Sequence, residues 1–188
     1  MRHYPVYTVT LDDNLNNLLL SQDKIRELGV DVVKVKRGGN ITFHGPGQLM
    51  IYSLWKLDNL NLHSVVQKLE EVGINIFKNY GVDVFRLEGY PGLWTYGSKI
   101  RKIASVGIAG KKMVTYHGIA LNITEDSQEY FKWIKSCGLH NIEMTSLKKE
   151  VGLKPDWEEL EEFVVKNLID ITGWNFTFKV QSESCKYC

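Results

Sequence analysis

Hydrophobic residues change their spacing several times along the chain, and each spacing predicts a different kind of element. Runs rich in β-branched and aromatic residues predict strands. These runs cover residues 4–10, 30–36, 41–44, 48–55, 82–87, 93–96, 103–108 and 113–123. In residues 62–77 the apolar positions recur every three or four residues, which predicts an amphipathic helix. The same period predicts a helix from Trp157 to Thr172, opened by Asp156 and closed by Gly173.

Shorter signals complete the predicted set of elements. Ser21 caps a helix over 22–28, and a second short helix begins at Asp126 or Ser127 and runs to about Ser136. Turns are predicted at 89–92 and 110–112, and aromatic residues alternate along a last strand, 174–180. Strands and helices mix without a regular βαβ rhythm. The sequence therefore predicts an α+β fold, with a mixed sheet core and helices packed on it.

The bulk composition fits one ordinary domain. The chain has 188 residues, of which 44% are hydrophobic and 24% charged, so we expect a single domain over 1–181 and a flexible tail over 182–188. A net charge of +1 gives no reason to expect nucleic acid as a partner, and no apolar run is long enough for a membrane. Three cysteines without a secretion signal indicate free thiols and a cytoplasmic location.

Two glycine-rich stretches carry the candidate chemistry. Residues 36–52 read KRGGNITFHGPGQLMIY, and residues 101–123 contain KIASVGI and VTYHGIALN. Both stretches contain an aromatic residue followed by His and Gly, at Phe43-His44-Gly45 and Tyr116-His117-Gly118. Glycine serves where the backbone turns through positive φ or approaches a ligand closely. Taken alone, each stretch also fits a glycine-rich hairpin, and a lone cysteine such as Cys137 more often packs than reacts.

Taken together and in this order, the motifs resemble the octanoyltransferases of lipoate biosynthesis, the lipoyl-[octanoyl] protein ligase B family. The resemblance is dense from about Tyr4 to Cys137. It implies the fold of lipoate and biotin protein ligases, and it implies neither a cofactor nor a metal. The implied donor is octanoyl-acyl carrier protein. The implied acceptor is a lysine on a lipoyl domain of a 2-oxoacid dehydrogenase or on the glycine-cleavage H protein.

The resemblance also implies roles for individual residues. Cys137 would carry the acyl group as a thioester, and Lys102 would lower the pKa of that thiol and move the proton. The implied substrate-binding residues are Arg37, Gly38, Gly39, Asn40, Ile41, Thr42, Phe43, His44, Ser105, Val106, Gly107, Gly118, Ile119 and Ala120. Tyr52 and His117 are weaker candidates, since His117 fits a buried strand histidine equally well. We expect the remaining histidines at the surface, namely His3, His63 and His140.

Two further hypotheses concern the substrates. A saturated acyl chain needs a narrow apolar slot, and we expect its walls to be Phe43, Leu49, Ile108, Ile119 and Leu121. An acidic carrier protein would be steered by a basic rim. Its candidate residues are Lys34, Lys36, Arg37, Lys99, Arg101, Lys111 and Lys112, for which ordinary solvated charges are the alternative.

Two features depart from the family pattern. The first strand begins close to Met1, whereas a strand and a helix usually precede it, so we expect either a shortened N-terminus or a natural start that differs from this Met1. The tail carries Cys185 and Cys188, whose Cys-x-x-Cys spacing is typical of half a zinc site or of a redox pair. With no second half visible, we expect a tail with free thiols.

Two other functions compete with octanoyl transfer. An ATP-dependent lipoate or biotin ligase of the same fold needs no cysteine nucleophile, and its pattern differs from the Gly45-Pro46-Gly47 that follows His44 here. A non-catalytic protein that binds acyl carriers or lipoyl domains would tolerate the loss of Cys137 or Lys102. Since both residues are present, catalysis is the preferred interpretation.

Overall fold

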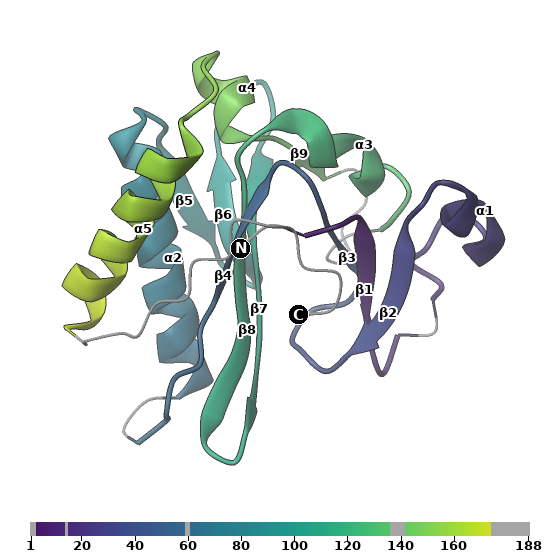
Figure 1. The fold of residues 1–188 in the computed structure, drawn as a ribbon, viewed down its shortest axis with the longest axis horizontal. Helices are drawn as coiled ribbons and strands as arrows, with labels where there is room; N and C mark the ends of the chain where they lie inside the picture. Colours follow the sequence, from purple (N-terminus) through teal and green to yellow (C-terminus); the bar gives the residue numbers. More distant parts are fainter. Residues whose placement is uncertain (1–2, 14, 59–60, 136–141, 174–188) are drawn as a thin grey trace.

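Two β-sheets organise the part of the chain that the computed structural model describes, residues 3–13, 15–58, 61–135 and 142–173. The six-stranded sheet has the order β4-β8-β7-β6-β5, and β9 pairs in parallel with β7. Its strands are β4 (Gln48–Tyr52), β5 (Val84–Leu87), β6 (Tyr90–Thr95), β7 (Arg101–Lys111), β8 (Val114–Asn122) and β9 (Glu143–Met144). The three-stranded sheet has the order β2-β1-β3 and lies beside it (Figure 1). Its strands are β1 (Val6–Thr10), β2 (Asp31–Val35) and β3 (Thr42–His44).

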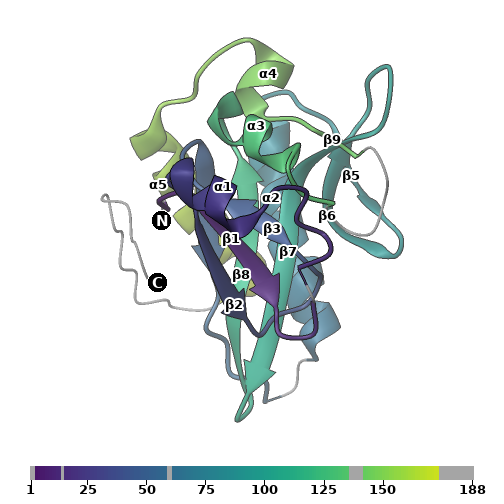
Figure 2. The ribbon, with the colours of Figure 1, turned by 90° about the vertical axis from the view of Figure 1, so that its right-hand side faces the viewer.

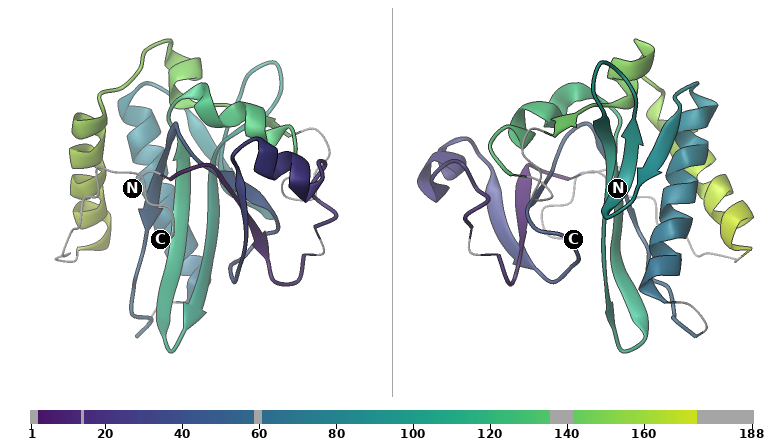
Figure 3. Two further views of the ribbon diagram at one scale, coloured as in Figure 1. Left: turned by 45° about the vertical axis from the view of Figure 1, so that its right-hand side comes forward. Right: turned by 180° about the vertical axis from the view of Figure 1, so that it is seen from behind.

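Two long helices cover the face of the larger sheet that points away from the smaller one, as Figure 3 shows from both sides. They are α2 (Leu62–Asn79) and α5 (Trp157–Thr172), and each begins at a capping side chain, Asn61 or Asp156. The apolar stripe of α2 packs on the inward residues of the sheet in one hydrophobic core. That core contains Val65, Leu69, Ile76, Leu49, Ile119 and Leu121. The period of three to four residues in the sequence is therefore a buried helix face.

A second, smaller core lies under the three-stranded sheet, on the side of α1 (Gln22–Glu27) and α3 (Gln128–Phe131) (Figure 2). A 3-10 turn, Glu125–Ser127, leads into α3. Tyr7 and Val9 of β1 and Phe43 of β3 are buried there, and the Phe43 ring stacks on Tyr130 at 4.3 Å between centroids. Successive strand residues point to opposite faces of a sheet, so the residues that alternate with Tyr7, Val9 and Phe43 along these strands face the larger sheet.

Most predicted elements are present, although several bounds differ. The predicted turn at 89–92 is wrong because only Glu88 and Gly89 turn, and Tyr90 begins β6. The helix predicted to reach Ser136 ends at Phe131, because Ile134 then pairs with Leu18 instead of continuing the helix. A short helix, α4 (Leu147–Val151), and β9 were not predicted. The predicted strand 174–180 and the tail with Cys185 and Cys188 lie outside the described residues, so the domain boundary at 181 stays a prediction.

None of the helices in the described ranges has both the length and the apolar character needed to cross a membrane.

Candidate active site

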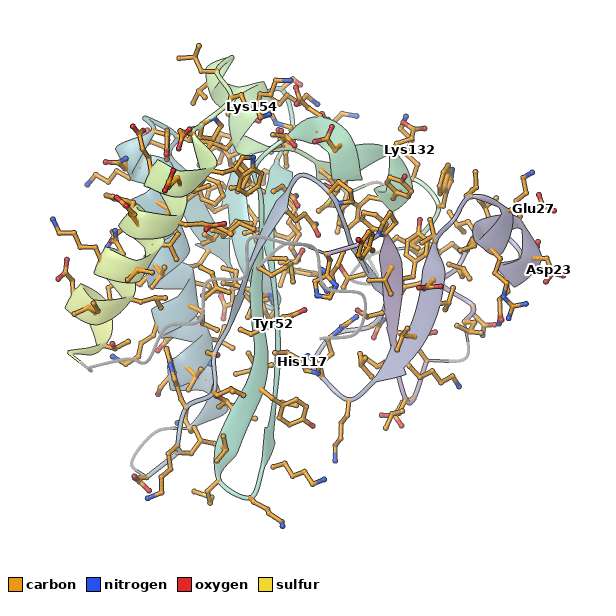
Figure 4. The ribbon with its side chains drawn as sticks, in the orientation of Figure 1. Asp23, Glu27, Tyr52, His117, Lys132 and Lys154 are labelled. Atoms are coloured by element: carbon orange, nitrogen blue, oxygen red, sulfur yellow. The ribbon has the colours of Figure 1, made fainter. Side chains whose placement is uncertain are left out.

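A cavity of about 660 Å³ lies between the two sheets, within the range of about 300–1,000 Å³ typical of small-molecule sites. Its walls come from alternate residues of facing strands, including Thr8 of β1, Thr42 of β3, Met50 of β4 and Ala120 of β8. Figure 4 shows Tyr52 and His117 lying between the sheets. The cavity thus occupies the layer that separates the two hydrophobic cores.

The Arg-Gly-Gly loop closes one side of this cavity. The Arg37 guanidinium donates from Nη2 to Thr8 O at 2.7 Å and to Thr8 Oγ1 at 2.9 Å, and from Nη1 to Gly38 O at 2.9 Å. The Gly38 amide donates to Ile108 O at 3.0 Å, which attaches the loop to β7. A Cβ on Gly107 would lie only 3.1 Å from Gly38 O. Glycine at 107 therefore permits this close approach of loop and strand.

A chain of buried hydrogen bonds joins the His-Gly-Pro-Gly loop to β7. Gly45 N donates to Gln48 Oε1 at 3.3 Å, and Gln48 Nε2 donates to Asn122 Oδ1 at 2.9 Å. Asn122 Nδ2 donates to Thr145 O at 3.0 Å, and Thr145 N donates to Lys102 O at 2.9 Å. The polar residues of both sequence motifs are thereby connected through the protein interior.

His44 is buried in the cavity wall and stays neutral at physiological pH. Burial is the main cause that lowers the pKa of His44 to about 3, and the charge of the nearby Arg37 adds to the effect. The side chain of Gln48 lies beside the ring and opposes this shift, but Nδ1 of His44 makes no hydrogen bond of ordinary geometry. His44 therefore presents an uncharged ring to the cavity.

His3 was expected at the surface, and this prediction is wrong. Its side chain is only 6% exposed, and Nε2 lies 2.7 Å from the Tyr52 hydroxyl. Burial lowers the pKa of His3 and raises the pKa of Tyr52 to about 12. The pair forms a neutral, hydrogen-bonded part of the cavity wall next to His44, whose ring centroid is 5.9 Å from that of His3.

His117 also faces the cavity, from the edge where β8 meets the Arg-Gly-Gly loop. Its φ of 65° lies in the left-handed region, which is uncommon for a residue other than glycine. Nε2 is 3.1 Å from Lys36 O, and since a carbonyl only accepts, Nε2 carries the proton. Burial lowers the pKa of His117, so this ring is neutral as well.

Lys102 is the most deeply buried lysine among the described residues, with 2% of its surface exposed. It lines the cavity from β7, and its Nζ lies 4.9 Å from the centroid of the Trp94 ring on β6. A cation over the face of an indole ring is attracted by the ring quadrupole. The structure therefore holds an amine in the cavity wall, at the end where β9 joins the sheet.

Most of the residues expected to bind substrate lie together on the cavity wall. They are Arg37, Gly38, Gly39, Asn40, Ile41, Thr42, His44, Ser105, Val106, Gly107, Gly118 and Ala120. Phe43 and Ile119 do not line it, so the expectation that their side chains form walls of the acyl slot is wrong. Both are fully buried in the two cores, because strand residues alternate between faces and these two point away from the cavity. Cys137 and His140 lie outside the described residues.

The apolar slot has different walls from those expected. Ile108 lines the cavity, but Leu49 and Leu121 point into the core under α2, as Ile119 does. Sequence reasoning missed the apolar residues that line the cavity instead. These are Val6, Val33, Val35, Met50, Met144 and, at one end, Leu62 and Val66. The two-residue period of the strands could have identified the cavity-facing positions, since each of Val6, Thr8, Thr42 and Met50 alternates with a core residue.

No group of three His, Cys, Asp or Glu side chains in the described part of the chain is arranged to hold a metal ion.

Comparison with known proteins decides the family. The sequence profile described as "Lipoyl protein ligase A/B catalytic domain" matches residues 1–169. An octanoyltransferase of Dictyoglomus thermophilum is 36% identical over 186 residues, which is 99% of this chain and 78% of that protein. The chain belongs to this family. An octanoyltransferase of Caldicellulosiruptor saccharolyticus is 38% identical and covers 95% of the chain and 76% of its own length. These relatives confirm the predicted family and identify the chain as an acyltransferase.

Solved structures of family members and their relatives share the fold. A lipoate protein ligase of Thermoplasma acidophilum, part of an archaeal lipoylation system with an E2 lipoyl domain, has a TM-score of 0.77. It is 14% identical, and the match covers 97% of this chain and 73% of that one. Biotin protein ligase from Aquifex aeolicus in complex with biotin and ATP has a TM-score of 0.56 at 16% identity, with 91% and 68% covered. The predicted fold is confirmed.

Proposed function

We propose that this octanoyltransferase moves an octanoyl group from acyl carrier protein to a lysine of a lipoyl domain through a thioester on Cys137. The observation that supports this most directly is Lys102, a buried amine in the wall of a cavity lined by the other motif residues. A two-step transfer holds the acyl group while one carrier leaves and the next arrives. A thiolate performs the attack, and a cation nearby favours that charged form.

The position of Cys137 in the chain also supports the pairing with Lys102. The segment that contains Cys137 begins after Lys135, whose amide donates to Asn17 O at 2.8 Å, and it runs into β9. In β9, Met144 pairs with Lys102. The cysteine thus belongs to a short connection that ends at the strand beside the buried lysine.

The chemistry balances over two steps. The Cys137 sulfur attacks the octanoyl carbonyl of the donor, the bond to the carrier sulfur breaks, and that sulfur takes a proton from the Lys102 ammonium. The acceptor lysine then attacks the Cys137 thioester as a neutral amine and forms an amide. Cys137 leaves as a thiolate, and the proton released by the acceptor nitrogen returns to Lys102. No ATP is consumed, because the donor thioester is already activated.

Intact mass after mixing the enzyme with octanoyl-acyl carrier protein, without ATP, tests this proposal. We expect an octanoyl adduct that hydroxylamine removes and that the Cys137→Ser variant does not form. A folded wild-type enzyme without an adduct would contradict the thioester. Adduct-free transfer that requires ATP and free octanoate would identify the ligase mechanism instead.

The basic rim proposed to dock the acidic donor contains fewer residues than the sequence suggested. Arg101 is 18% exposed and pairs with Glu150 at 2.9 Å, and Arg37 bonds to Thr8, so neither serves as a free surface charge. The exposed members are Lys34, Lys36, Lys99, Lys111 and Lys112. Lys111 and Lys112 stand at the tip of the long hairpin of β7 and β8 (Figure 1).

Reversing the charge of Lys111 and Lys112 is expected to lower kcat/KM for octanoyl-acyl carrier protein roughly tenfold at low salt and to flatten its salt dependence. Transfer from a small octanoyl thioester should change little, because that donor carries no acidic surface. Lys166→Glu on the opposite helix layer provides the matched control. If the salt dependence of the double variant equals that of wild type, the hairpin tip takes no part in docking.

A further inference from the structure

Glu70 is a buried acid that the reaction scheme does not use. It lies on α2 with 5% of its surface exposed, on the same helix face as its buried neighbours Leu69 and Gly73. A buried carboxylate is costly unless it is hydrogen-bonded or paired. The groups that bind the Glu70 carboxylate therefore indicate the role of this residue.

One partner is the backbone of β6 and the other is an arginine on β5. Glu70 Oε1 accepts a hydrogen bond from Gly92 N at 2.9 Å, and Oε2 lies 3.1 Å from Arg86 Nε. Glu71, the next residue, also binds Arg86, at 2.7 Å, but its side chain is 47% exposed. The two acids share one arginine, and Glu70 alone of the pair bonds to Gly92.

Gly92 needs this bond because it sits in a bulge. Arg86 pairs with Leu93 and Leu87 with Tyr90, so Pro91 and Gly92 have no partner residue on β5. The Gly92 φ of 120° is one that other residues rarely adopt. A bulge re-aims the neighbouring side chains and leaves a backbone group unpaired. The carboxylate of Glu70 takes the place of the missing strand partner.

The bulge shapes both surfaces that hold the Lys102 side chain. A Cβ at Gly92 would lie 2.9 Å from Lys102 Cε and 2.3 Å from Ala104 O, so the lysine stem runs directly over this glycine. Trp94, whose ring lies under Lys102 Nζ, donates from Nε1 to Tyr90 O at 3.1 Å, within the same bulged segment. A shift of the bulge would therefore move the ring and the stem contact together.

We propose that Glu70 is a positioning residue for Lys102: through Gly92 it fixes the β6 bulge that keeps the lysine stem on Gly92 and its amine over Trp94. The inference rests on the proposed role of Lys102 in activating Cys137. Glu70 touches neither substrate nor the reacting atoms. It acts on Lys102 through Gly92 and the Trp94 ring, and the Arg86 guanidinium balances the charge of its carboxylate.

Three substitutions separate this role from simple stability. Glu70→Leu removes the acceptor for Gly92, Glu70→Gln keeps an oxygen acceptor without the charge, and Glu71→Leu removes only the exposed pairing with Arg86. We measure kcat and KM for octanoyl transfer. We also measure the pH dependence of Cys137 alkylation by iodoacetamide, with peptide masses to distinguish it from Cys185 and Cys188.

We expect Glu70→Leu to lower kcat by roughly ten- to a hundredfold with little change in KM, as small misplacements of a reacting group do. Its Cys137 alkylation should shift to higher pH, whereas Glu70→Gln and Glu71→Leu should behave like wild type. A purely structural role would lower the unfolding temperature and leave the alkylation profile unchanged. That result, or a Glu70→Gln variant as impaired as Glu70→Leu, would overturn the proposal.

Two more variants keep the test decisive. If Glu70→Leu does not fold, Glu70→Asp retains the charge but is one methylene too short to reach Gly92, and it should show the same loss; wild-type behaviour would overturn the inference. Lys102→Met is measured in parallel. If it leaves turnover and alkylation unchanged, the proposed role of Lys102 fails first; if it impairs both while Glu70→Leu does not, only the positioning role fails.

Discussion

Replacing Lys102 by methionine is expected to reduce octanoyl transfer by roughly 10²- to 10⁴-fold, the usual contribution of a positioned acid–base group. Methionine has a similar length and can keep the contact of the stem with Gly92 and the Trp94 ring. Because the side chain is 2% exposed, an apolar replacement of this size should not cost much stability. Single-turnover transfer from octanoyl-acyl carrier protein, with unfolding temperature as a check on folding, measures the effect.

Lys166→Met provides the matched control, since Lys166 is exposed on α5 and belongs neither to the motifs nor to the basic rim. It tests whether the loss of any lysine charge lowers transfer. We expect turnover close to that of wild type. Equal losses in the two variants, or normal turnover in Lys102→Met, would remove Lys102 from the mechanism.

Stability should fall as the pH is lowered, and His44 should account for a large part of the loss. The pKa of His44 is about 3 in the folded protein and near its ordinary value of 6.5 in the unfolded chain. Between these values the unfolded chain binds more protons, so the stabilisation is complete above about pH 6.5 and is lost progressively toward pH 3. Between pH 6.5 and about pH 4.5 the loss of stability from this residue is roughly 2 kcal/mol.

Urea unfolding of wild type and of His44→Asn at both pH values isolates this contribution. Carboxylates and the neighbouring His3 and His117 titrate in both proteins, and the nearby Arg37 charge is present in both, so their effects largely cancel in the difference. The exposed His63→Asn variant should follow wild type. An equal pH-dependent loss in His44→Asn and wild type would show that His44 does not resist protonation in the fold.

The strands and the long helices could be predicted because their patterns are local. Leu62 to Phe77 repeats with the helical period, and Asp156 and Gly173 mark the ends of the last helix by their side-chain and backbone chemistry. The motif residues were also recognisable by type and order. The assignment of Phe43 and Ile119 to the cavity was wrong because it treated neighbours in a motif as neighbours in space, whereas a strand sends them to opposite faces.

What the sequence did not predict depends on pairings between distant segments. The bulge at Pro91 and Gly92 resembled an ordinary turn, because Gly-Tyr-Pro-Gly is typical of one and the register against β5 is not written locally. The burial of His3 depends on Tyr52, 49 positions away. Glu70 was not singled out in the sequence, although its place on the apolar face of α2 was a signal that it is buried.

The separation of the two hydrophobic cores has a consequence for how the enzyme would select acyl chains by their length. Hydrogen bonds such as Gly38 N to Ile108 O and His117 Nε2 to Lys36 O link the two sheets, and the cavity between them lies where the two hydrophobic cores face each other. A bound acyl chain would supply the missing apolar layer and become, for one turnover, part of the protein interior. The length of the acyl chain would then be selected by how well it fills the cavity between the two sheets, rather than by contact with any single side chain. An acyl chain that is too short would leave part of the cavity unfilled, and one that is too long would push the two sheets apart.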